Sequence, residues 1–135
     1  MAIVDWPAGL AICFMPASVQ GGLRDNRYSF ETDDKMPPIE RPATSWAPEV
    51  YSLTLAPMSR TEFEAFQKWY RGPLAYGVNS FVFPHPVTRV DMVWKIVKAD
   101  PPYHVRRLGR IPAGTDLRRI EVGFSIMSLP LSVPV

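Results

Sequence analysis

Proline restricts the fold of this chain more than any other residue type. Fifteen of its 135 residues are proline, which is about twice the roughly 5% of an average protein. Because proline has no backbone N–H and its ring clashes with the preceding turn of a helix, these residues punctuate strands and loops far more readily than helices. We therefore do not expect an all-helical fold.

The rest of the composition indicates one domain over residues 1–135. Hydrophobic residues make up 47% of the chain, with four Trp, seven Phe and five Tyr, and a chain of this length buries roughly two thirds of its unfolded surface. Such a core needs neither a disulfide nor a metal. The one cysteine, Cys13, lies in an apolar stretch, and we interpret it as a small buried hydrophobe rather than a nucleophile.

Charge and hydropathy narrow the possible locations and partners. The formal net charge of +2 is too close to neutral to predict binding to nucleic acid or to a membrane surface. Asp5 and Pro7 stand where a signal peptide has a basic start and an apolar run. The longest apolar stretch, residues 8–19, contains Pro16 and is too short for a membrane-spanning helix. We expect a soluble protein made in a reducing compartment.

The first 49 residues are expected to hold little regular structure. Residues 1–24 mix apolar residues with Pro7, Pro16 and a Gly21-Gly22 pair, which favours an extended N-terminal arm or an edge strand. Residues 25–49 are polar and rich in proline, which predicts a long loop with a short strand at 28–31. Long loops inside compact domains are usually functional or ordered by a partner.

A strand and a helix follow this loop. Residues 50–55 alternate between apolar and other side chains, which is the pattern of a half-buried strand. Ser59 and Glu62 have the spacing of a capping box, so a helix is expected to begin there and to end at Gly72-Pro73. Its apolar stripe, expected to face the core, is Phe63, Phe66, Trp69 and Tyr70.

Four further strands are predicted at residues 80–83, 87–97, 103–108 and 117–127. The alternating apolar residues of the two long strands are Val90, Met92, Trp94 and Ile96, and Ile120, Val122, Phe124 and Ile126. An antiparallel meander is the economical topology. The expected fold class is mainly β (α+β), an antiparallel β-sandwich or barrel-like sheet of five to seven strands with one short α-helix packed on it.

The residues that could carry a reaction are few. His85 lies between two prolines and His104 begins a predicted strand, and neither has a Cys or paired carboxylates at the spacing of a metal site or an acid–base pair. Gly21-Gly22 lacks the following helix, Lys and Ser/Thr of a phosphate-binding loop. We interpret both histidines as structural or surface residues and expect no catalytic residue, no cofactor and no metal.

One charge asymmetry suggests a partner. Five arginines lie on the last predicted hairpin, namely Arg106, Arg107, Arg110, Arg118 and Arg119. Because Arg is well suited to interface ion pairs, this hairpin could meet the acidic residues of the long loop, Glu31, Asp33 and Asp34, in a second copy of the chain. A solvated hairpin whose charges prevent edge aggregation is an equally weighted alternative. DNA contact is less favoured, because no aromatic residues for base stacking are interleaved with the arginines.

The order of elements between about Arg41 and Met127 resembles a family of viral tail proteins. The segments that carry the resemblance are the strand Tyr51-Ser52-Leu53-Thr54-Leu55, the helix from Glu62 to Tyr70, the strand Ser80-Phe81-Val82-Phe83-Pro84 and the final strand Ile120-Glu121-Val122-Gly123-Phe124-Ser125. They are similar to the lambda-type minor tail protein M and to the N-terminal domain of distal tail proteins of long-tailed bacteriophages. The opening Asp5-Trp6-Pro7-Ala8-Gly9-Leu10 also resembles small tail proteins of siphophages and gene transfer agents.

This resemblance implies a structural protein of the virion tail tip rather than an enzyme. Members of the family form a ring, usually a hexamer, at the distal end of the tail tube, between the last tube ring and the hub or baseplate proteins. The resemblance implies a homo-oligomer made in the host cytoplasm, with DNA only passing through the lumen, and it brings no catalytic residues. The alternative interpretation is a small mainly-β binding module or one that interacts with nucleic acid.

Overall fold

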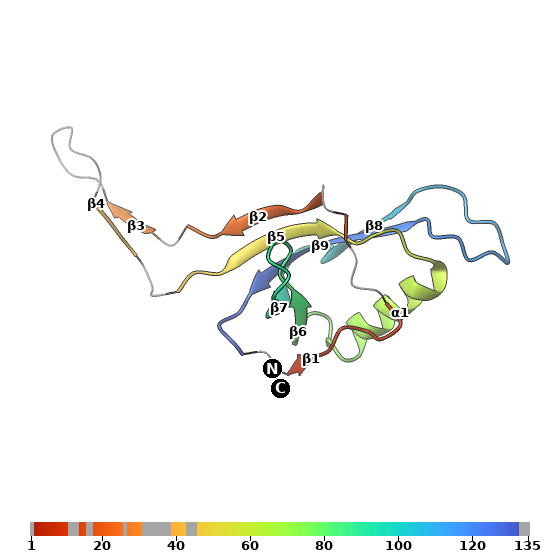
Figure 1. Cartoon of the computed structure of the whole chain (residues 1–135), viewed down its shortest axis with the longest axis horizontal. Helices are drawn as coiled ribbons and strands as arrows, with labels where there is room; N and C mark the ends of the chain where they lie inside the picture. Colours follow the sequence, from red (N-terminus) through yellow and green to blue (C-terminus); the bar gives the residue numbers. More distant parts are fainter. Residues whose placement is uncertain are drawn as a thin grey trace.

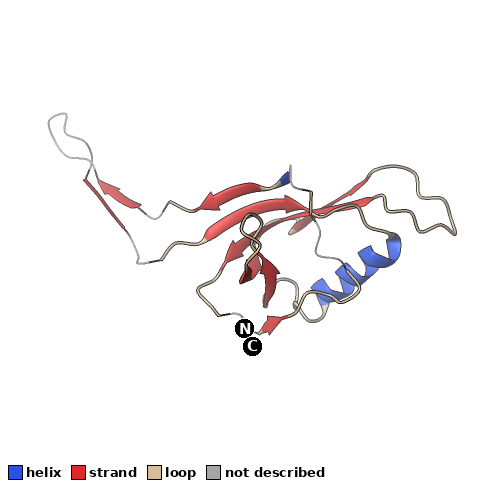
Figure 2. Ribbon diagram, in the orientation of Figure 1, coloured by secondary structure: helices blue, strands red, loops and turns tan. Residues whose placement is uncertain are grey.

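The computed structural model describes residues 2–10, 14–15, 18–25, 27–30, 39–42 and 46–132. It is mainly β, as the sequence predicts, with one α-helix on the sheet (Figure 2). The strands are β1 (Ile3–Val4), β2 (Gln20–Leu23), β3 (Arg27–Phe30), β4 (Ile39–Pro42), β5 (Glu49–Thr54), β6 (Ser80–Pro84), β7 (Asp91–Ile96), β8 (Tyr103–Arg107) and β9 (Ile120–Ser128), and the helix is α1 (Arg60–Arg71).

Seven of these strands form one open sheet. Its order is β1-β6-β7-β9-β5-β2, and β8 also pairs with β9. The predicted meander is wrong, because β9 pairs with β5 from far earlier in the chain and β1 runs parallel to β6. The sheet is therefore mixed, and it is not closed into a barrel.

Strand β9 is the centre of the sheet. Its C-terminal half pairs with β7 and its N-terminal half pairs with β8, both antiparallel and along the same side of β9. Its other side pairs with β5. The alternation predicted for this strand is confirmed: the residues that face the core, from Ile120 to Ile126, are buried.

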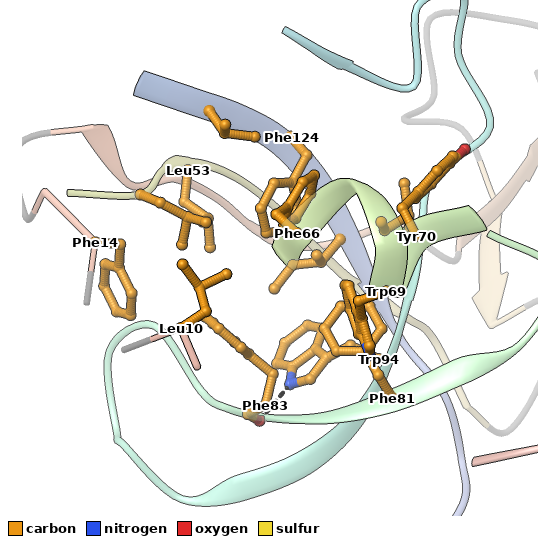
Figure 3. Close-up of a cluster of buried hydrophobic side chains, with 14 of the residues drawn as sticks. Leu10, Phe14, Leu53, Phe66, Trp69, Tyr70, Phe81, Phe83, Trp94 and Phe124 are labelled. Atoms are coloured by element: carbon orange, nitrogen blue, oxygen red, sulfur yellow. Dashed lines mark hydrogen bonds between the residues drawn. The ribbon is translucent and has the colours of Figure 1, made fainter. Parts of the chain in front are cut away.

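Helix α1 follows the predicted boundaries. The Ser59 hydroxyl accepts from the Glu62 amide, the Glu62 carboxylate accepts from the Ser59 amide, and Gly72 ends the helix. The apolar stripe faces the sheet, where the Phe66 ring lies 5.1 Å from the Tyr103 ring and 6.1 Å from the Phe124 ring. Figure 3 shows Phe66, Trp69 and Phe124 among the aromatic side chains that converge between α1 and the strands. The predicted core face of the helix is confirmed, with Phe63 partly buried at its margin.

The N-terminal segment is built into the core, whereas the sequence favoured an arm or an edge strand. The Trp6 ring lies 5.0 Å from the Trp69 ring, and the Trp69 indole N–H donates to the Asp5 carbonyl at 2.8 Å. Leu10 and Phe14 are each 5% exposed. The edge-strand part of the expectation holds for β2, which pairs only with β5 among the described strands.

Strand β7 is shorter than predicted. The expected strand began at Val87, but residues 85–90 form the turn between β6 and β7, closed by the amide of His85 donating to the carbonyl of Val90 at 2.8 Å. Val90, which the sequence analysis grouped with Trp94 and Ile96 in one alternating series, is therefore exposed. Trp94 and Ile96 are buried as expected.

Part of the predicted long loop forms a second, two-stranded sheet. β3 lies at the strand expected there, and β4, which the sequence analysis missed, pairs with it antiparallel. Chain order makes β3 and β4 the outer part of one long hairpin whose inner part is β2 and β5. Three residues, 24–26, separate β2 from β3 in the chain, whereas six, 43–48, separate β4 from β5.

The molecule is elongated, with a hairpin at each end. In Figure 1 the β3–β4 arm stands clear of the body at one end, and the loop between β8 and β9 extends at the opposite end. Among the described residues no helix could span a membrane, since α1 has only 12 residues.

Candidate assembly interface

The five arginines predicted to form an interface lie on the β8–β9 hairpin, and the structure exposes all of them. The hairpin consists of β8, the loop of residues 108–119 and the start of β9. Two contacts hold its loop against the start of α1. The Thr61 hydroxyl donates to Asp116 at 3.3 Å, and Arg118 Nε lies 3.3 Å from Glu62 Oε1.

Three of the five arginines are engaged within their own chain. Arg118 pairs with Glu62 as described. Arg106 Nε lies 3.7 Å from Glu121 Oε2, its direct cross-strand partner on β9. The Arg119 guanidinium donates to the Arg110 carbonyl at 2.7 Å. The arginines of the two ion pairs are mostly exposed, so the pairs contribute little to stability, but they neutralise two charges that the sequence analysis had assigned to a partner.

Arg107 and Arg110 differ from the other three. Within the described part of the chain, neither guanidinium has an ion pair or a hydrogen bond. Of the five arginines predicted to form a basic surface, these two are therefore the ones left without a partner among the described residues.

Apolar side chains accompany the free arginines, and sequence reasoning missed them. Val105, Leu108 and Leu117 on the same hairpin are 49%, 41% and 40% exposed. Arginine is enriched in protein interfaces relative to the rest of a protein surface, so the hairpin combines such a cation with exposed apolar side chains. The available signal was that Leu108 and Leu117 flank the loop of residues 109–116 in the predicted hairpin.

Strand β8 also has an unpaired edge. The amide of Leu108 donates to the carbonyl of Arg119, and hydrogen-bonded pairs alternate along an antiparallel ladder. The backbone groups of His104 and Arg106 therefore face β9, while those of Tyr103, Val105 and Arg107 face away from it. None of the outward groups bonds to another described residue.

The acidic residues of the predicted interface are not among the residues that the structure describes. Glu31, Asp33 and Asp34 lie outside the described residues, as does Cys13. The strands that flank the acidic segment in the chain, β3 and β4, lie at the opposite end of the molecule from the β8–β9 loop (Figure 1).

His85 is a structural residue in this fold. It is 5% exposed, and its Nδ1 accepts from the amides of Val87 and Thr88 at 3.0 and 3.1 Å. Nε2 therefore carries the ring proton and donates to Glu49 Oε1 at 3.3 Å. Tyr51 packs on the imidazole edge-to-face, and burial, reinforced by the Glu49 carboxylate, raises the pKa of its hydroxyl.

His104 lies on the opposite face of the sheet. It is exposed at the side of an open pocket of about 390 Å³, whose floor includes Ser52, Gly123 and Ser125. No group of three or more His, Cys, Asp or Glu side chains suited to a metal occurs among the residues that the structure covers.

Comparison with protein-family models, with curated proteins and with solved structures found no match to this chain.

Proposed function

We propose that this chain is a structural protein of a phage-like tail, which forms a ring of identical copies at the distal end of the tail tube and joins the tube to the hub or baseplate. The proposal starts from the resemblance of residues 41–127 to tail proteins. The strand, helix and final strand that carry this resemblance are β5, α1 and β9, and they pack around one core.

The observation that carries the proposal is the placement of two different projections at opposite ends of the molecule (Figure 1). A closed ring is built from heterologous contacts, in which one surface of each copy meets a different surface of the next. The β3–β4 arm and the β8–β9 hairpin are two such surfaces, and neither can meet the other within one chain.

The low stability expected of the β3–β4 arm by itself also favours this function. A two-stranded hairpin is marginally stable in water by itself, and β3 and β4 pair only with each other among the described strands. Contact with a neighbouring copy would bury its surface and supply the missing support.

Negative-stain electron microscopy of the purified full-length chain tests the proposal. We expect closed rings of uniform diameter with a central opening. Open filaments, or particles no larger than a single domain, would contradict it. A salt-dependent gain in mass on adding short duplex DNA to such single particles would favour the alternative, a nucleic-acid-binding module.

A further inference from the structure

We propose that a groove between the end of β7 and the loop after α1 binds an extended acidic segment of a partner protein, which adds to the edge of β7. The groove has a volume of about 490 Å³. Its described lining residues include none from the β3–β4 arm or from the loop of residues 108–119. The inference therefore goes beyond the proposed function and does not depend on a ring.

The first observation is an unpaired stretch of backbone at Ile96, which lines the groove. The amide of Val97 donates to the carbonyl of Ser125 on β9, and hydrogen-bonded pairs alternate along an antiparallel ladder. The N–H and C=O of Ile96 therefore face away from β9, on the side of β6, whose pairing with β7 ends at Phe81 opposite Trp94. Neither group bonds to another described residue. Such an edge binds extended segments through main-chain hydrogen bonds.

The second observation is the apolar wall opposite this edge. Tyr76 and Val78, on the loop that follows α1, line the groove and are 68% and 60% exposed. Ala75 and Tyr76 have φ values of 50° and 57°, which residues other than glycine rarely adopt. Tyr70 of α1 holds this loop, because its hydroxyl donates to the Tyr76 carbonyl at 3.1 Å and its carbonyl accepts from the Tyr76 amide at 2.8 Å. A strained backbone that holds apolar side chains in solvent is typical of a binding site.

The third observation is uncompensated positive charge. Lys95 and Lys98 line the groove, and within the part of the chain that the structure covers neither ammonium group has an ion pair or a hydrogen bond. No carboxylate is among the described lining residues. Because partners present complementary charge across an interface, the segment that enters this groove is expected to be acidic.

The two faces of the sheet specify the pattern of the segment. Ile96 lies opposite Ile126 and shares the core face with it, whereas Lys95 lies opposite Met127 on the other face. Successive side chains of an added strand also alternate between faces. A residue opposite Ile96 would therefore place an apolar side chain on the side of Tyr76, and its neighbours would place carboxylates beside Lys95. The structure thus favours a segment in which apolar and acidic residues alternate.

This edge suits a peptide better than a nucleic acid or a second copy of the chain. The C=O of Ile96 needs a donor and its N–H needs an acceptor. A peptide backbone supplies both, whereas the phosphodiester backbone of DNA supplies acceptors only. The edge strands β2 and β8 of a second copy contain no acidic residue.

The test measures binding of labelled peptides to the full-length chain by fluorescence anisotropy. The acidic probe is a blocked peptide in which valine and glutamate alternate, and its control has lysine in place of every glutamate. We expect the acidic probe to bind at least about tenfold more tightly. N-methylation separates main-chain pairing from charge, because a valine opposite Ile96 directs its N–H toward β7 and the adjacent glutamates direct theirs away. Methylation of the valine nitrogens should weaken binding at least about tenfold, and methylation of the glutamate nitrogens should not.

Variants of the chain test the side chains of the groove. Lys95→Glu combined with Lys98→Glu should reverse the preference, so that the lysine peptide binds more tightly than the acidic one. Val78→Ser should weaken binding of the acidic probe about fivefold. The matched control is Val87→Ser, which removes a valine of similar exposure (68%) from the turn between β6 and β7 and should leave binding unchanged. Each variant should unfold thermally like the wild type.

The possible results separate this inference from the proposed function. Equal binding of the acidic and lysine peptides, or no binding of either, would overturn the acidic occupant. Equal binding of the two N-methylated peptides would overturn strand addition at Ile96. Tighter binding of single-stranded oligothymidylate than of the acidic probe would show that a nucleic acid is the occupant. A chain that binds the acidic probe as expected but stays monomeric would refute the ring alone, and rings that do not bind the probe would refute this inference alone.

Discussion

The buried imidazole of His85 offers a sharp test of how this fold is held together. His85 joins the turn between β6 and β7 to the start of β5 through two amide donors and one carboxylate. Replacement by alanine leaves the Val87 and Thr88 amides without their acceptor, and it removes a ring that contacts both Tyr51 and Trp94.

The expected magnitude follows from these contacts. A hydrogen bond contributes about 0.5–1.5 kcal/mol net, and His85 makes three, so we expect His85→Ala to lose about 3 kcal/mol in total. Unfolding entropy is roughly 2.1 cal/mol/K per residue, so this loss lowers the Tm of a 135-residue chain by about 10 °C.

Asparagine at this position separates the two kinds of contact. Its side-chain oxygen can accept from the amide two residues later, as in an Asx turn, but it cannot fill the space of the ring. We expect His85→Asn to recover about 1–2 kcal/mol relative to His85→Ala in urea denaturation. The control is His104→Ala, an exposed histidine, which should leave stability within about 0.5 kcal/mol. Equal destabilisation by alanine and asparagine would refute the assignment of Nδ1 as the acceptor.

Three further predictions concern the edge strand, the core and the arm. Gly21→Ala would place a Cβ 2.0 Å from the carbonyl oxygen of Val50, so hydrogen exchange should show lost protection in β2; protection equal to that of Gly22→Ala, which has open space, would contradict this. Phe66→Ala should lower the free energy of unfolding by about 3–5 kcal/mol, and a loss below about 1 kcal/mol in denaturant would show that the core is loosely packed there. The hydrogen bonds that Asp25 accepts from Arg27 hold the pKa of the Asp25 carboxyl at about 2; by NMR titration, Arg27→Gln should return it toward 3.8, and an unchanged value would exclude that cause.

The elements of this fold could be predicted wherever the local pattern is complete. The capping box of Ser59 and Glu62 fixed the start of α1, and strict alternation identified β5 and β9. These signals depend on neighbours within a few residues, so one sequence contains them in full.

The order of strands depends on contacts that local pattern does not encode. β5 and β9 are separated by the helix and three strands, yet they form the centre of the sheet. The segment with Leu10 and Phe14 was predicted as an arm or an edge strand because Pro7 and Pro16 break the surrounding pattern, but both side chains pack in the core. Their burial is a tertiary effect that periodicity cannot detect.

The candidate interface was only partly predictable for the same reason. The arginine cluster is visible in the sequence, but the ion pairs that two of its members form within the chain are not. Glu62 serves both the helix cap and Arg118, and Glu121 meets Arg106 only because of the β8–β9 register. Knowledge of that register is also what reveals the free edge at Val105.

The native mass of the purified full-length chain, measured across a concentration series, tests the central claim most directly. The account predicts one closed assembly, most simply six copies of the 15.3 kDa chain, with no open-ended series of larger species. A single 15.3 kDa species at every concentration would contradict it.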